Sequence, residues 1–177
     1  IVKPFTYRFE NPRQKIAHHL GKINIIHFFK DQSKIDLTYS LQYNNRKEYD
    51  IRRGGRSEIP ALDLKLLSNN LLTTYSWYKL YDKKDARIDG KGGINFLAKH
   101  NSNNPQTGIR PLIPDYYQYS TGIFDMEKFS IKNFIVEVGA RYDFTRFLAY
   151  KFDKQNNLLK PTFNFHTYAF SAGTSWK

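Results

Sequence analysis

Apolar and polar residues alternate along residues 35–43, and this pattern predicts the first element of the fold. The apolar or aromatic positions are Ile35, Leu37, Tyr39, Leu41 and Tyr43, and a polar residue stands between each two of them. Two residues is the period of a β-strand, so an extended chain here has one apolar and one polar face. The segment is about as long as the ~9–11 residues that cross a bilayer, whereas strands in soluble sheets average ~5–6. We therefore expect a strand of a barrel in lipid.

Other segments show the same alternation with different strength. Residues 134–145 and 168–176 alternate almost without exception, whereas residues 71–77 and 117–123 alternate more weakly. Residues 16–29 change parity part-way, which predicts a β-bulge. No segment has a helical period, so the pattern predicts an all-β protein.

Breaks rich in Gly, Pro, Asn and Asp divide the chain into about eight strands, joined alternately by short and long connections. The short connections are residues 30–34 and 129–132, and the long ones are residues 51–60, 101–115 and 150–161. Residues 79–92 are long where a short turn is expected, and Gly90–Gly93 resembles a turn ahead of a strand. Outer-membrane barrels have short turns on one side and long loops on the other, so we expect an antiparallel transmembrane β-barrel segment.

The polar positions of these strands are candidates for a water-filled lumen. The lumen-facing candidates are Asp36, Gln42, Glu137, Arg141 and Asp143. Glu137, Arg141 and Asp143 are two or four residues apart on one face, close enough to join cross-strand networks inside a wide barrel. A solvated face of a soluble β-sandwich remains the alternative, because it shows the same alternation.

Composition narrows the class of protein further. A chain of 177 residues suggests one domain, and because it begins at Ile1 without a secretory signal we expect it to be a piece of a longer protein. No run of 18 apolar residues exists, which excludes a helical membrane span but not a barrel. Cysteine is absent, so disulfides and thiolate metal sites are excluded. The 13 Tyr and 14 Phe suit a membrane interface.

The formal net charge is +12, which raises the question of a nucleic-acid partner. The basic residues are scattered over turns, loops and polar strand faces, and no motif for binding DNA or RNA accompanies them. We therefore expect no nucleic-acid partner. Solvated loops explain most of this charge, and attraction to anionic lipid or an anionic ligand remains the alternative.

Three segments carry a family resemblance: residues 48–64, which contain Arg52-Arg53-Gly54-Gly55-Arg56, residues 107–116, and Val138-Gly139-Ala140-Arg141-Tyr142-Asp143. Together they resemble the barrel of TonB-dependent outer-membrane receptors, particularly those of Bacteroidetes-type bacteria, over residues 12–176. The resemblance implies a 22-stranded barrel in the outer membrane of a Gram-negative cell. It also implies an N-terminal plug, energy from the TonB protein, and import of iron chelates, haem, cobalamin or glycans.

No segment resembles a plug or a TonB box, so we expect residues 1–177 to be a partial barrel that cannot transport anything alone. The implied partners are the plug of the same parent chain, the TonB energy-coupling protein, outer-membrane lipid and a small-molecule chelate. Two alternatives remain open. One is a non-energised porin or adhesin-like barrel, and the other is a soluble β-domain that binds anionic partners.

The candidate ligand-binding residues are Arg52, Arg53, Arg56, His100 and Arg110. The three arginines beside two glycines could bind carboxylates or phosphates of a chelate, although ion pairs with nearby acidic residues explain them better. Arg110 precedes Pro111, so this stiffened loop is expected to fold inward or to pack on a neighbour. His100 is the first histidine to test as a haem ligand, but the histidine spacing matches no metal motif. We expect no metal site, no cofactor and no catalytic residue, and therefore not an enzyme.

Overall fold

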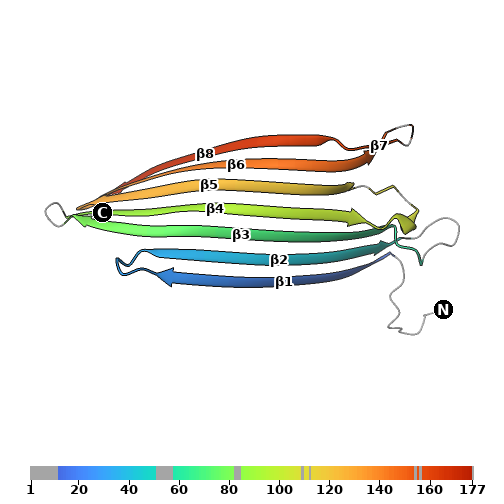
Figure 1. Ribbon diagram of the computed structural model, residues 1–177, viewed down its shortest axis with the longest axis horizontal. Coiled ribbons are helices and arrows are strands. Elements are labelled where there is room, and N and C mark those ends of the chain that lie inside the picture. Colours follow the sequence, from blue (N-terminus) through green and yellow to red (C-terminus); the bar gives the residue numbers. More distant parts are fainter. Residues whose placement is uncertain are drawn as a thin grey trace, which may run out of the picture.

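The protein is a single antiparallel β-sheet, seen in a computed structural model that describes residues 12–50, 58–81, 85–108, 110–111, 113–153, 155 and 157–176. The strands are β1 (Arg13–Phe28), β2 (Lys34–Tyr49), β3 (Leu62–Tyr81), β4 (Ala86–Asn103), β5 (Asp115–Ile131), β6 (Phe134–Phe152), β7 (Leu158–Leu159) and β8 (Thr162–Trp176). Neighbours in sequence are neighbours in the sheet from β1 to β6 (Figure 1). The short β7 and the long β8 both pair with β6. The prediction of about eight antiparallel strands is confirmed.

The sheet is open. β1 and β8 form its two margins, and each has a hydrogen-bonded neighbour on one side only among the described residues (Figure 1). The chain crosses the sheet in seven long strands, so β1 and β8 run in the same direction. Direct pairing of these two margins would therefore require a parallel ladder in an otherwise antiparallel sheet.

All short connections lie at one end of the sheet and all long ones at the other (Figure 1). At the turn end, residues 29–33, 82–85 and 132–133 join the strands; at the loop end, residues 50–61, 104–114 and 153–161 do so. The prediction of a long connection at residues 79–92 is wrong, because β3 continues to Tyr81 and β4 begins at Ala86. The alternation of short and long connections therefore has no exception.

The short turns share a backbone feature that their composition does not show. Each contains one non-glycine residue in the left-handed region: Gln32 (φ 62°), Asp85 (φ 45°) and Lys132 (φ 52°). A tight reversal between antiparallel strands needs positive φ, which glycine adopts more easily than any other residue. The backbone N–H of Lys132 also donates to the carbonyl oxygen of Asp85 over 3.1 Å, so the second and third turns are joined.

Two expectations about local structure are wrong. The bulge expected in residues 16–29 is absent, because every residue of β1 pairs with one residue of β2 in an unbroken register. The parity change in the sequence instead places apolar side chains on both faces of this marginal strand. Gly90–Gly93 is not a turn but lies inside β4, where Gly90 pairs with Trp77 and Glu127.

The strands are staggered evenly across the sheet. The register row through Thr162, the first residue of β8, runs through Leu148, Tyr117, His100, Leu67 and Tyr43 to His19. His19 lies six residues after the start of β1 at Arg13, and six strand steps separate β1 from β8. The stagger is therefore about one residue per strand. With ~3.3 Å per residue and ~4.8 Å per strand, this corresponds to a strand tilt of ~35°.

The sheet has no second layer among the described residues. Of the apolar side chains in the described ranges, two are buried, Leu64 (8% exposed) and Ala149 (7%). Large side chains such as Phe170 (80%) and Trp176 (77%) remain mostly exposed. One sheet face in water cannot bury enough apolar area to offset the ordering of the chain, so the hydrophobic contacts that stabilise this sheet must come from its surroundings.

Candidate functional site

The unbroken register sorts the side chains of all seven long strands onto two faces. The apolar face carries the odd-numbered residues of β1, β2, β3 and β5 and the even-numbered residues of β4, β6 and β8. Its middle consists of Ile23, Ile25, Leu37, Tyr39, Leu71, Ile94, Phe96, Ile123, Tyr142, Phe144 and Tyr168. Asp125 and Glu127 on β5 interrupt it towards the turn end, opposite Gly92 and Gly90. The opposite side of the sheet is the polar face.

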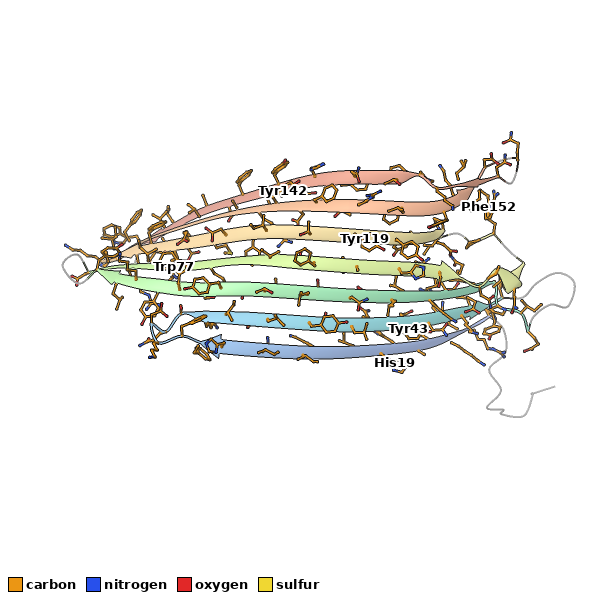
Figure 2. The ribbon with its side chains drawn as sticks, in the orientation of Figure 1. His19, Tyr43, Trp77, Tyr119, Tyr142 and Phe152 are labelled. Atoms are coloured by element: carbon orange, nitrogen blue, oxygen red, sulfur yellow. The ribbon has the colours of Figure 1, made fainter. Side chains whose placement is uncertain are left out.

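Aromatic side chains mark both borders of the apolar face. The loop-end aromatic row is His19, Tyr43, His100, Tyr117 and Tyr119, and the turn-end aromatic row is Tyr75, Trp77, Phe129, Phe134 and Trp176. Figure 2 shows Tyr43 and Tyr119 towards the loop end and Trp77 towards the turn end. The rings pack against each other across strands. The ring centroids of His19 and Tyr43 are 6.3 Å apart, and those of Phe134 and Trp176 are 6.2 Å apart. Rings of this kind favour the two interfaces of a membrane.

The separation of the two aromatic rows gives the height of the apolar face. Tyr119 and Phe129 belong to different rows and are ten residues apart on β5. At ~3.3 Å per residue this is ~33 Å along the strand. The strand tilt of ~35° reduces it to ~27 Å of depth, close to the ~25 Å height of the apolar band on outer-membrane barrels.

All five lumen-facing candidates lie on the polar face. Asp36 accepts a hydrogen bond from Asn24 (Nδ2 to Oδ1, 2.5 Å), and Gln42 lies between Leu20 and Ser68 in the register. Glu137 forms an ion pair with Lys128 (3.2 Å). The structure therefore places on one face of the sheet the candidates that the alternation assigned to one side, although those on β2 and those on β6 are four strand steps apart.

Arg141 is the centre of a network on the polar face. Its guanidinium binds Asp143 through two parallel hydrogen bonds, Nε to Oδ2 (2.6 Å) and Nη2 to Oδ1 (2.5 Å). Nη2 also donates to Oδ1 of Asn95 (3.3 Å), and Asn95 donates in turn to Oδ1 of Asn70 (3.1 Å). The network links β6, β4 and β3. A forked arginine–carboxylate pair is strong and fixes direction, so it orders this part of the polar face.

Gly122 makes the reach of Arg141 across β5 possible. A Cβ at Gly122 would lie 2.2 Å from Oδ1 of Asp143 and 2.9 Å from Nη2 of Arg141. Any larger residue would therefore displace the ion pair. The sequence predicted a role for Arg141 and Asp143 but missed Asn70, Asn95 and Gly122. Their part depends on strand register, which no local pattern reveals.

His100, the candidate haem ligand, lies on the apolar face in the loop-end aromatic row. Its imidazole stacks on the ring of Tyr117 with 4.2 Å between centroids and 4° between planes. Within the described ranges, no three His, Asp or Glu side chains gather into a group that could hold a metal ion. His100 therefore lies among the rings at the border of the apolar face.

Arg110 packs on the neighbouring loop, in line with the expectation for it. Its Nη2 donates to the backbone carbonyl oxygen of Asp153 (3.2 Å), and its guanidinium lies 5.7 Å from the ring centroid of Phe152. It also lines a cavity of about 450 Å³ at the loop end, together with Asp115 and Tyr150. Arg52, Arg53 and Arg56, the other candidates for ligand binding, lie outside the described residues.

Two carboxylates organise the connections at opposite ends of the sheet. Hydrogen bonds from the side chain and backbone of Ser33 hold the pKa of Asp31 below its usual value. The side chain and then the backbone of Asn157 lower the pKa of Asp153 in the same way, with Gln155 adding to the effect. Because both carboxylates are better hydrogen-bonded when folded, they stabilise their connections at neutral pH. That contribution disappears as the pH falls below about 4.

Comparisons with known proteins add no identity to these observations. No family model matches the sequence, and neither the curated proteins nor the solved structures contain a match. In the part of the chain that the structure describes, no helix is long and apolar enough to cross a membrane.

Proposed function

We propose that this chain is a section of the β-barrel of a TonB-dependent outer-membrane receptor. The apolar face meets lipid, and the polar face lines the lumen and contacts a plug. The receptor captures a small-molecule ligand, such as an iron chelate or haem, and releases it inward when TonB acts on the plug. The observation that carries the membrane part of this proposal is the exposed apolar face that extends over all seven long strands, bordered at both ends by aromatic rings.

The geometry of the sheet supports a barrel larger than these strands. The stagger of about one residue per strand is the shear that tilted barrel strands require. Open margins do not occur in the hydrocarbon region of a membrane, because unpaired backbone groups cannot be satisfied there. β1 and β8 run in the same direction, so an antiparallel closure needs an odd number of additional strands.

The receptor class is supported by the resemblance of the loop segments, above all Arg52-Arg53-Gly54-Gly55-Arg56 and residues 107–116. The polar face supports a lumen in contact with a plug, because the Arg141 network presents fixed donors and acceptors to whatever fills the interior. The ligand remains a class, a small anionic chelate or haem.

Phe96 and Leu97 offer a sharp test of the lipid-facing assignment. They are adjacent apolar residues, but Phe96 (53% exposed) lies in the middle of the apolar face and Leu97 on the polar face. In the full-length protein folded in phosphatidylcholine vesicles, Phe96→Arg should lower the free energy of unfolding by ~2–4 kcal/mol, the cost of a charge near the bilayer midplane. Leu97→Arg should cost less than about 1 kcal/mol, because its face is solvated.

Equal effects of the two substitutions, measured by urea titration, would show that the apolar face does not meet lipid. The same outcome would favour a soluble β-domain. The energised class is tested separately in cells by growth on iron chelates as the only iron source. Uptake that continues after deletion of the TonB protein would contradict a TonB-dependent receptor and leave a porin-like barrel.

A further inference from the structure

Basic side chains gather at the loop end of the apolar face, where Arg13 forms an ion pair with Glu58. Lys15 on β1, Lys47 on β2, Lys65 on β3 and Arg146 on β6 form what we call the basic belt. All four project on the same side of the sheet as the loop-end aromatic row. The belt is therefore on the surface that the proposed function places against lipid.

The stagger of the strands brings these residues to one level. Leu67 and Leu148 belong to one register row, with Lys65 two residues beyond Leu67 towards the loops and Arg146 two residues before Leu148. Relative to the register row, Lys65 is thus four residues closer to the loops than Arg146. The row itself moves towards the loops by about three residues over the three strand steps from β3 to β6, and this shift cancels most of the difference. Arg146 therefore lies at nearly the same depth as Lys65 in a tilted sheet.

The charges of the basic belt are poorly compensated. Lys15 stands directly opposite Lys47 in the register, an arrangement that destabilises a sheet unless an anion lies nearby. Lys47 forms an ion pair with the buried Asp63 (3.3 Å). Lys65 and Arg146 are exposed and form no hydrogen bond or ion pair with any described residue. Within the part of the chain that the structure describes, three of the four cations thus have no carboxylate partner.

The depth of the basic belt matches that of lipid phosphates. Lys15 is four residues beyond His19, and Lys47 is four residues beyond Tyr43, on the loop side of the loop-end aromatic row. At ~3.3 Å per residue and a tilt of ~35°, Lys15 and Lys47 lie ~11 Å outside these two rings, in the region of the head groups, whereas Arg146 is the register partner of Tyr119 in the same aromatic row. Lysine and arginine at this depth attract anionic lipids.

The opposite border of the apolar face has the opposite charge character. Asp125 and Glu127 lie near the turn-end aromatic row, where Lys79 is the basic residue on this face. The surface therefore distinguishes the two leaflets by charge. From this asymmetry and the uncompensated belt, we propose that Lys15, Lys47, Lys65 and Arg146 bind phosphate groups of anionic lipids in the leaflet on the loop side. This inference rests on the proposed function, because it requires the apolar face to meet lipid.

The test compares two triple variants of the full-length protein, purified in a neutral detergent. The belt variant is Lys15→Gln, Lys65→Gln and Arg146→Gln. The control is Lys22→Gln, Lys91→Gln and Lys99→Gln, which removes three positive charges from the polar face. Phosphatidylglycerol is titrated into each protein, and bound lipid is counted by native mass spectrometry.

The belt variant should bind phosphatidylglycerol about fivefold more weakly for each cation removed, whereas the control should bind it like the unmodified protein. Inorganic phosphate should compete poorly, because a lipid phosphate is held at the belt by its acyl chains. Equal lipid binding by both variants, or equally efficient competition by inorganic phosphate, would overturn the inference.

Insertion into phosphatidylcholine vesicles separates this result from the proposed function. A protein that inserts into neutral vesicles but does not prefer phosphatidylglycerol contradicts the belt alone. A protein that remains folded in water and never inserts contradicts both the belt and the membrane barrel.

Discussion

A Cβ added at Gly90 would lie 2.2 Å from Nε1 and 2.3 Å from Cε2 of Trp77, so the indole occupies space that only glycine leaves open. At the scale of single residues, this contact explains why a glycine lies in the interior of a long strand. Glycine weakens a strand unless another group approaches it closely, and here that group is a ring of the turn-end aromatic row. The indole thus lies across two strands.

Gly90→Ala should therefore destabilise the detergent-folded protein by ~1–3 kcal/mol, because the added methyl group forces the indole out of its position. The measurement is urea unfolding followed by tryptophan fluorescence, which reports on Trp77 and Trp176. Gly21→Ala is the matched control, since a Cβ there meets nothing within 4 Å. An equal change in both variants would show that Trp77 does not depend on Gly90.

The hydrogen-bond network of the polar face was predictable from the sequence only in part. Alternation along β6 assigned Glu137, Arg141 and Asp143 to one side, and a two-residue spacing suffices for the Arg141–Asp143 pair. The partners Asn70 and Asn95 are 71 and 46 residues from Arg141 in sequence, and only the register of four strands brings them into one network. Local spacing carries no information about such contacts.

At the scale of elements, the strands were predictable where alternation is strict and were underestimated elsewhere. β3 has 20 residues, although its sequence alternates only over residues 71–77 and weakly there, because pairing with β2 and β4 extends a strand beyond its own pattern. Gly90–Gly93 resembled a turn in the sequence, but pairing with β3 and β5 holds these residues inside β4. Cross-strand pairing, rather than local propensity, decided both cases.

The three short turns differ from the preferred hairpin sequences, which place Gly or Asn at positions with positive φ. Lys132, at φ 52°, is the clearest case in the two-residue turn between β5 and β6. Lys132→Gly should raise the free energy of unfolding by ~0.5–1 kcal/mol, because relief of the left-handed strain exceeds the added entropy of the unfolded chain. Urea titration in detergent measures the difference.

Asn133→Gly is the control for this turn, since Asn133 is not among the residues with positive φ. It gains flexibility in the unfolded chain without relief of strain, so it should lower stability. A stabilisation by Asn133→Gly equal to that of Lys132→Gly would contradict the assignment of strain to Lys132.

At the scale of the whole molecule, the features with the largest consequences are the openness of the sheet and the direction of its two outermost strands. Seven long strands leave β1 and β8 parallel to each other, so the isolated chain should not close on itself. The sequence predicted the number of strands and their antiparallel order. Only the resemblance to a 22-stranded barrel predicted a partial barrel, because closure depends on groups at the margins and not on alternation within strands.

Cysteine pairs can test this arrangement directly, because the chain contains no cysteine of its own. Gly21→Cys with Leu41→Cys should form a disulfide efficiently in the detergent-folded chain of 177 residues, since Gly21 and Leu41 are register partners. Gly21→Cys combined in turn with Asn164→Cys, Tyr168→Cys or Ala172→Cys should not. An efficient link from β1 to any of these positions on β8 would show a closed barrel of seven long strands.

The described residues include very few buried apolar side chains, and this affects how the sequence can change during evolution. A residue in a packed core must match the shape of its neighbours, whereas a residue that faces fluid lipid needs only to be apolar. On the proposal that the apolar face meets lipid, positions such as Ile23, Phe96 and Ile123 should exchange freely among apolar residues without loss of fold. Relatives of this protein would share its parity of faces while differing at most of these positions, and a search that compares the alternation would detect them better than one that compares residues.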